Sequence, residues 1–130
     1  MAEKNFVTAL VAQNATETTK TQASTDGYTV PQGVSKLVEV GLQIVMAGVT
    51  TLESISAILE IESSDAAVFS TQQFVTPTIV PLGTDVAPVI PAYIHDCDIA
   101  VAPGSHLMFG VTFNAALTIN PSWRVFGKLR

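Results

Sequence analysis

Hydrophobic and polar side chains alternate along much of the chain from residue 35 onward. Successive side chains of a β-strand point to opposite sides, so an alternating run predicts a strand with one buried face. The clearest run lies in residues 35–47, where the alternating hydrophobic positions are Val38, Val40, Leu42, Ile44 and Met46. Further strands are predicted over residues 67–75, 93–101, 105–114 and 122–129, with turns at residues 103–104 and 120–121.

Two other segments are open to more than one interpretation. In residues 51–62, Thr50 and Glu53 could form a helix capping box, with hydrophobic residues at helical spacing. The same segment alternates from Ser54 to Glu62, which favours a strand, and a strand is the prediction. Residues 77–91 contain four prolines and are predicted as a long loop that can hold one short edge strand.

Residues 1–27 have a composition of their own. Residues 14–26 include no large hydrophobic side chain, whereas residues 6–11 are apolar enough to dock on a surface. The segment is therefore either an arm that docks on a neighbouring molecule or an edge strand of the same domain. Residues 28–130 form the predicted domain.

The strand pattern predicts the fold class. About eight short strands separated by turns indicate an all-β protein, an antiparallel two-sheet sandwich, with an eight-stranded jelly roll as the leading topology. The phase of the alternation predicts a core of Val38, Val40, Leu42, Ile44, Ile55, Leu59, Ile61, Ile99, Val101, Leu107, Phe109, Val111, Phe113 and Trp123.

Composition indicates that a partner covers part of the surface. Hydrophobic residues make up 48% of the 130 residues and charged residues only 13%, about half the usual share. Charged and polar residues interrupt the longest apolar stretch, residues 37–49, so a membrane span is not expected. Since a signal sequence is not expected either, a protein partner better explains the apolar excess.

Charge is divided unevenly along the chain. Residues 37–123 carry eight acidic residues and no Lys or Arg, whereas residues 124–130 carry three basic ones. An acidic body repels phosphate, so direct binding of nucleic acid is not expected.

The cluster His95-Asp96-Cys97-Asp98 is the one place where metal-binding residue types gather. A strand would send only His95 and Cys97 to the same side, too few for zinc. Calcium at Asp96 and Asp98, helped by Asp85 or a carbonyl, stays an alternative to a plain acidic face.

The sequence offers little for catalysis. Ser105 and His106 are neighbours and cannot pair as nucleophile and base within a strand, and Glu60 and Glu62 lack a recognisable cleft. We therefore expect no enzyme activity, no catalytic residue, no metal site and no cofactor. Cys97, the single cysteine, is expected to be a small buried residue.

Candidate interface residues lie out of phase with the predicted core. If Trp123, Val125 and Leu129 face inward, the residues between and after them form an outward basic stripe with one aromatic ring. A homo-oligomer, most simply a trimer, is predicted to bury such residues; a protected, solvated strand edge is the alternative. The candidates are Ile58, Arg124, Phe126, Lys128 and Arg130.

Three segments carry a resemblance to a known family. Residues 30–35 (VPQGVS) lead into a strand, residues 99–104 (IAVAPG) precede residues 110–114 (GVTFN), and a strand closes the chain. Over residues 28–130 this succession of strands and turns resembles that of the small jelly-roll capsid and decoration (cement) proteins of double-stranded DNA viruses and phages.

The resemblance implies a structural virion protein, made in the host cytoplasm, that assembles with itself and with other capsid subunits. The small size favours a decorating or minor capsid role. The alternative is a carbohydrate-binding β-sandwich that stacks sugars on exposed aromatic rings. The candidate rings are Tyr28, Phe69, Phe74 and Phe126.

Overall fold

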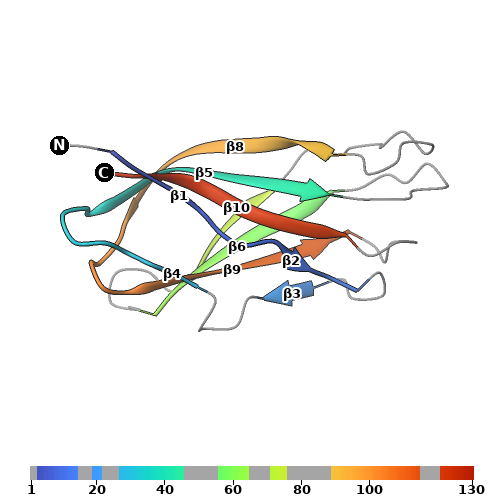
Figure 1. Cartoon of the computed structure of the whole chain (residues 1–130), viewed down its shortest axis with the longest axis horizontal. Helices are drawn as coiled ribbons and strands as arrows, with labels where there is room; N and C mark the ends of the chain where they lie inside the picture. Colours follow the sequence, from blue (N-terminus) through green and yellow to red (C-terminus); the bar gives the residue numbers. More distant parts are fainter. Residues whose placement is uncertain are drawn as a thin grey trace.

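The structure is a computed structural model that describes residues 3–14, 19–21, 27–45, 56–64, 71–75, 89–114 and 121–130. Within these ranges there are ten strands and no helix (Figure 1). The strands are β1 (Lys4–Val7), β2 (Val11–Ala12), β3 (Thr19–Thr21), β4 (Tyr28–Thr29), β5 (Lys36–Val45), β6 (Ala57–Ser63), β7 (Thr71–Val75), β8 (Val89–Ala100), β9 (His106–Phe113) and β10 (Ser122–Leu129).

The strands form two antiparallel sheets that pack against each other. Sheet A has the order β1-β10-β5-β8, and β2 also pairs with β10. Sheet B has the order β3-β9-β6-β7, and β4 also pairs with β9. The predicted all-β, antiparallel two-sheet sandwich is therefore confirmed.

The core lies between the sheets, and period-2 alternation supplies most of it. Phe109, Phe113 and Trp123 are buried as predicted, and Ile99 packs against the core while partly exposed. In the ambiguous segment the strand prediction is confirmed from Ala57 onward, while Ile55 lies outside the described residues. The buried hydrophobic residues are Phe6, Val30, Val34, Leu37, Val40, Leu42, Ile44, Ala57, Leu59, Ile61, Val101, Leu107, Phe109, Val111, Phe113, Trp123, Val125 and Leu129.

The prediction for Val38 was wrong. Leu37 is fully buried in its place, and the register of β5 shifts between Leu37 and Glu39 against Leu129 and Lys128 of β10. A β-bulge adds one residue to a strand, so the alternation changes phase across it. Val38 is the added residue, and the alternation resumes with Val40 inward and Glu39 outward.

Strand β8 starts earlier than the alternation predicted. It begins at Val89 and passes through Pro91, which the sequence had assigned to a loop. Among the described strands β8 pairs only with β5, so it forms an edge of sheet A. An edge strand tolerates proline because an amide that faces away from the sheet needs no partner there.

The N-terminal residues lie along the edges of both sheets. Strands β1 and β2 follow β10, and β3 pairs with β9. Gln13 is buried and accepts a hydrogen bond of 3.0 Å from the Trp123 indole Nε1–H, which ties the end of β2 to β10. Figure 1 shows the start of β1 and the end of β10 side by side at one end of the sandwich, where Lys4 pairs with Leu129.

The turn at residues 102–105 agrees with the sequence prediction. The Ser105 amide donates to the Ala102 carbonyl at 3.1 Å, and Gly104 has a φ of 84°. Proline followed by glycine at positive φ is typical of a type II turn. This turn joins β8 to β9 and so leads the chain from sheet A to sheet B.

Candidate assembly interface

Strand β10 places four of the five predicted interface residues on one surface. Its inward side chains are buried, so the intervening Arg124, Phe126 and Lys128 lie on the outer face of sheet A. Arg130 follows directly at the end of the strand. Ile58 lies on β6, where its neighbours on either side are buried, so it belongs to the outer face of sheet B. The structure thus separates Ile58 from the other four.

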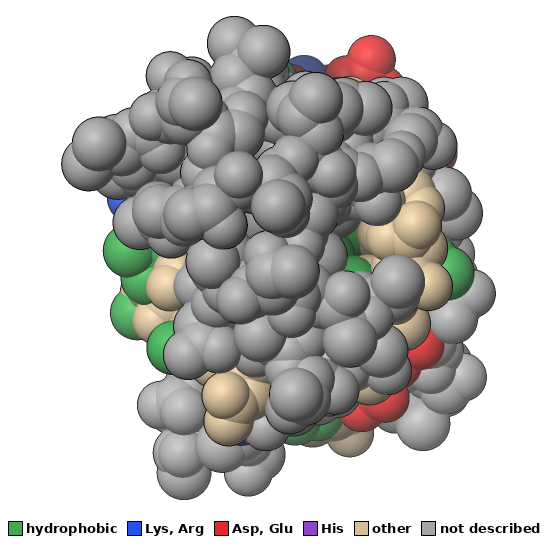
Figure 2. Space-filling view, turned by 90° about the vertical axis from the view of Figure 1, so that its right-hand side faces the viewer, with side chains coloured by type: hydrophobic (Ala, Val, Ile, Leu, Met, Phe, Trp, Pro, Cys, Tyr) green, Lys and Arg blue, Asp and Glu red, His purple; other side chains and the backbone are tan. Residues whose placement is uncertain are grey.

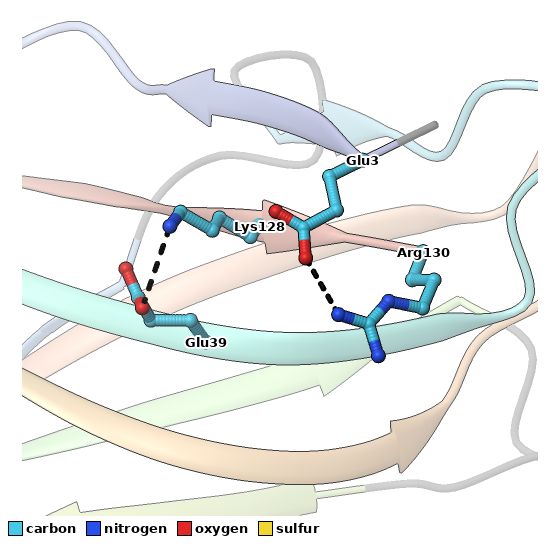
Figure 3. A network of polar contacts seen from close by, with 4 residues as sticks. All are labelled: Glu3, Glu39, Lys128 and Arg130. Carbon is cyan, nitrogen blue, oxygen red and sulfur yellow. Dashed lines mark hydrogen bonds and ion pairs between the residues drawn. The ribbon is translucent and has the colours of Figure 1, made fainter. Parts of the chain in front are cut away.

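The basic residues of β10 and the Arg130 that follows it each have a partner within the chain, and Figure 3 shows the partners of Lys128 and Arg130. Lys128 Nζ lies 3.9 Å from Glu39 Oε2 on β5, and Arg130 Nη2 lies 2.6 Å from Glu3 Oε1. Arg124 Nε donates to Gln43 Oε1, also on β5. The predicted basic stripe is therefore a row of cross-strand pairs rather than a set of free cations.

Glu3 is the carboxylate that this arrangement affects most clearly. The hydrogen bond from Arg130 holds the pKa of Glu3 below its usual range, and the positive charges of Arg130 and Lys128 add to the effect. Both groups are exposed, so the pair serves to position the start of β1 beside the end of the chain.

Phe126 lies across the strand next to it. Gly41 on β5 is its register partner, and a Cβ atom added at Gly41 would collide with the Phe126 ring. The ring is therefore half-buried without entering the core. Glycine at position 41 is what leaves room for an aromatic ring to lie flat on the outside of the sheet.

The register extends this contact into a row across all four main strands of sheet A. Val7 on β1 pairs with Phe126, Phe126 with Gly41, and Gly41 with Ile94 on β8. Val7 is 62% exposed and Ile94 56% exposed. We call these four residues the apolar row. Next to it lies a depression of about 360 Å³, lined by Asn5, Phe6, Val7, Glu39, Phe126, Gly127 and Lys128.

The end view of the molecule shows where acidic side chains reach the described surface. In Figure 2, several hydrophobic side chains lie along the flank that faces the viewer in Figure 1, where sheet A lies; the opposite flank carries hydrophobic side chains too, together with acidic ones, which also appear at the top edge. On sheet B, Glu60 and Glu62 take the outward positions of β6. A smaller depression of about 190 Å³ there is lined by Ser56, Ala57, Ile58, Thr112, Phe113 and Asn114.

The structure shows the two aspartates of the predicted cluster on β8 and a partner of one of them. Asp96 and Asp98 are exposed, and Asp98 pairs with Lys36 at 3.0 Å, while Asp85 lies outside the described residues. No group of three or more metal-binding side chains is found among the residues that the structure describes.

Cys97 lies against the core, half-buried, and its thiol donates to the Leu37 carbonyl at 3.4 Å. Burial raises the pKa of the Cys97 thiol to about 11, and the negative charges of Asp96, Asp98 and Glu39 add to the shift. It lines a depression of about 500 Å³ near the chain end. Because the thiol stays protonated near neutral pH, Cys97 is a poor nucleophile.

Two further sequence candidates have structural partners of their own. The Ser105 hydroxyl donates to the Ala102 carbonyl at 2.6 Å, and His106 Nδ1 lies 3.1 Å from Thr29 Oγ1. The Tyr28 ring stacks on Phe6 with the ring centroids 4.6 Å apart, so one of its two faces is covered. Phe69 lies outside the described residues, and so does the side chain of Phe74.

Sequence reasoning missed three members of the apolar row: Val7, Gly41 and Ile94. Ile94 carried a signal, because it is a large hydrophobic residue out of phase with the core side of its strand. The row itself depends on the register between strands that are distant in sequence.

Comparison of the chain with models of known protein families gives no match, and comparison with curated proteins gives none either. The described part of the chain also contains no helix of the length and hydrophobicity needed to cross a membrane. The fold and the outer surfaces are therefore the basis for the functional argument.

Proposed function

We propose that the protein is a structural virion subunit, a capsid or capsid-decorating protein that acts through self-assembly and shell contacts. The observation that carries the proposal is the strand order. With β1 and β2 counted as one strand, and β3 and β4 as another, the sheets have the orders 1-8-3-6 and 2-7-4-5. This order favours a jelly roll, the double-sheet architecture that viral capsid domains use.

A fold hosts many functions, so the surface has to support the proposal as well. The outer face of sheet A carries exposed hydrophobic side chains, whereas its described cations are paired with groups of the same chain. Such a face suits contact with another protein better than contact with nucleic acid, since phosphate is bound through free cationic groups.

Light scattering tests self-assembly. A self-assembling subunit is expected to have a mass in solution that is a multiple of 13.7 kDa at micromolar concentration, and three copies would support the predicted trimer. A mass of one chain at all concentrations, with no binding to a shell of other subunits, contradicts the proposal. The number of copies and the choice between lattice-forming and decorating roles follow from the same measurement combined with electron microscopy.

A further inference from the structure

We propose that the outer face of sheet A binds the same face of a second copy, with a two-fold axis that runs along the strands between β10 and β5. The inference rests on the proposed self-assembly and assigns to it a surface and a two-fold symmetry, so a dimer takes the place of the trimer predicted from the sequence. A two-fold contact requires a patch that is complementary to itself, because each copy presents the same residues. Sheet A meets this requirement in three successive rows.

The three rows each join one residue of β10 to its register partner on β5. Lys128 is opposite Glu39, Phe126 is opposite Gly41, and Arg124 is opposite Gln43. In every row the two members complement each other: a cation with a carboxylate, a ring with the space left by glycine, and a guanidinium with an amide oxygen.

A two-fold axis between these strands places β10 of one copy over β5 of the other. Lys128 of each copy then faces Glu39 of its neighbour, and the two Phe126 rings, each lying over Gly41 of its own chain, meet at the axis. Sheets that pack face to face cross at about 30°, and this rotation moves the side chains nearest the crossing point least. With the Phe126 row at the crossing point, the rows of Lys128 and Arg124 lie two residues away on either side, and the rotation shifts them by ~3–4 Å, which their long side chains can span.

The outer strands of the sheet match in the same way. The axis exchanges β1 with β8, so it brings Val7 of one copy to Ile94 of the other. These two are among the most exposed large hydrophobic residues of the described surface. The apolar row thus gains a hydrophobic contact at both of its ends, and burial of such side chains is the main favourable term in association.

Charge on the face permits this contact. Lys128, Arg130 and Lys36 each form an ion pair with an acidic residue of the same chain. A paired surface has a smaller net charge to desolvate when another protein covers it, and its pairs can be shared across the interface.

The opposite face of the sandwich is a poorer partner. If sheet A of one copy bound sheet B of the next, two faces on opposite sides of each copy would be used, and an open stack would form instead of a closed assembly. Glu60 and Glu62 also lie outward on sheet B, away from the hydrophobic row. A second copy of sheet A is the better complement.

The available area is sufficient for a specific contact. Four strands at the usual spacing, over the ten residues of β5, offer roughly 600 Å² per copy, or roughly 1,200 Å² in total. This is the lower limit of stable interfaces, so we expect a dimer that dissociates at low concentration.

The first experiment compares Ile94→Asp with Ile58→Asp by sedimentation or light scattering over a dilution series. Both changes place a carboxylate on an outward position, one on each sheet. The inference predicts that Ile94→Asp raises the dissociation constant at least about tenfold, whereas Ile58→Asp leaves it unchanged. Circular dichroism checks that both variants remain folded.

The second experiment uses charges that the two-fold axis would exchange. Lys128→Glu alone should raise the dissociation constant roughly tenfold at low salt, and the pair Lys128→Glu with Glu39→Lys should restore it. The restored variant should associate with itself but poorly with the parent chain, because like charges then face each other. The mixed sample, with one partner labelled, is the decisive measurement.

The outcomes separate the inference from the proposed function. An oligomer that tolerates Ile94→Asp, or a double variant that mixes freely with the parent, overturns the sheet A contact and leaves self-assembly intact. If only Ile58→Asp abolishes association, the sheet A contact is likewise overturned, self-assembly stands, and the contact is assigned to sheet B. A parent chain that is monomeric at all concentrations overturns the sheet A contact, and it overturns the proposed function too if it also binds no shell of other subunits.

Discussion

Phe109 and Phe126 show that the side of the sheet to which a residue points decides whether it contributes to core packing or to the surface. Phe109 lies fully buried between the sheets, whereas Phe126 lies on the outside over Gly41. The two residues have the same side chain and opposite surroundings. A comparison between them therefore separates core packing from surface function.

We expect Phe109→Ala to lower the free energy of unfolding by about 3–5 kcal/mol, because it leaves a cavity in the core. Phe126→Ala should cost about 1 kcal/mol or less, since the ring is outside the core. Urea titration followed by circular dichroism measures both. Similar losses for the two variants would contradict the assignment of inner and outer faces.

Cys97 gives a second prediction at this scale. Its raised pKa of about 11 means that folding favours the neutral thiol, so this contribution to stability is present below the ordinary thiol pKa and is lost as the pH rises toward about 11. At about pH 8, the folded protein should react with a disulfide reagent roughly 100-fold more slowly than the unfolded chain does. Equal rates in the two states would show that the thiol is accessible and ionised.

At the scale of elements, the two edge pieces β1 and β2 are held to β10 by particular polar contacts. Gln13 accepts the indole hydrogen bond of Trp123 at the end of β2, and Glu3 pairs with Arg130 at the start of β1. The first contact is buried and the second is exposed. Loss of the buried contact is therefore expected to lower the free energy of unfolding, whereas loss of the exposed pair is expected to change the titration of the Glu3 carboxyl.

Gln13→Ala should lower the free energy of unfolding by about 1–3 kcal/mol, because the buried indole N–H loses its acceptor. Asn14→Ala, at the exposed neighbouring position, is the matched control and should have little effect. Chemical denaturation measures the difference. If the two variants are equally stable, the contact between Gln13 and Trp123 does not hold the end of β2.

Arg130→Gln should raise the titration midpoint of the Glu3 carboxyl toward its ordinary value, as followed by NMR of the side-chain carboxyl carbon. In the parent protein the lowered pKa means that the contribution of this pair is present above the ordinary carboxyl pKa and is lost as the pH falls. Lys20→Gln removes a charge on sheet B and should leave the midpoint unchanged. A midpoint that does not move in Arg130→Gln would rule out the pair in solution.

At the scale of the whole molecule, the distribution of charge can be tested without changing the fold. Arg124 and Lys128 lie outward on sheet A, whereas Lys4 and Lys20 lie elsewhere on the molecule. Reversal of either pair to Glu changes the net charge equally. A difference between the two double variants therefore reports position rather than total charge.

We expect Arg124→Glu with Lys128→Glu to leave the melting temperature nearly unchanged, because exposed pairs contribute only about 0.2–1 kcal/mol each. The same variant should weaken assembly, more at low salt than at high salt, where screening has already removed most of the attraction. Lys4→Glu with Lys20→Glu should weaken assembly less. Equal assembly of both variants at low ionic strength would show that the charges of β10 only protect the strand.

Alternation by itself determined the fold class, most of the core and the outward positions of Arg124, Phe126 and Lys128. It could do so because burial in a two-sheet sandwich follows a period of two along each strand. It failed at Val38, where a bulge against β10 changes the phase, and at Val89, where pairing with β5 continues the strand through Pro91. Both features depend on a neighbouring strand that no local pattern reveals.

Only the tertiary structure decided which outward residues lie together. The apolar row joins residues from four strands, and the partners of Lys128 and Arg130 come from β5 and from the chain start. It also placed Ile58 on the opposite sheet from the other predicted interface residues. Sequence encodes the side to which each residue points, whereas register and sheet order, which arise from pairing between distant segments, determine the surface that those residues form.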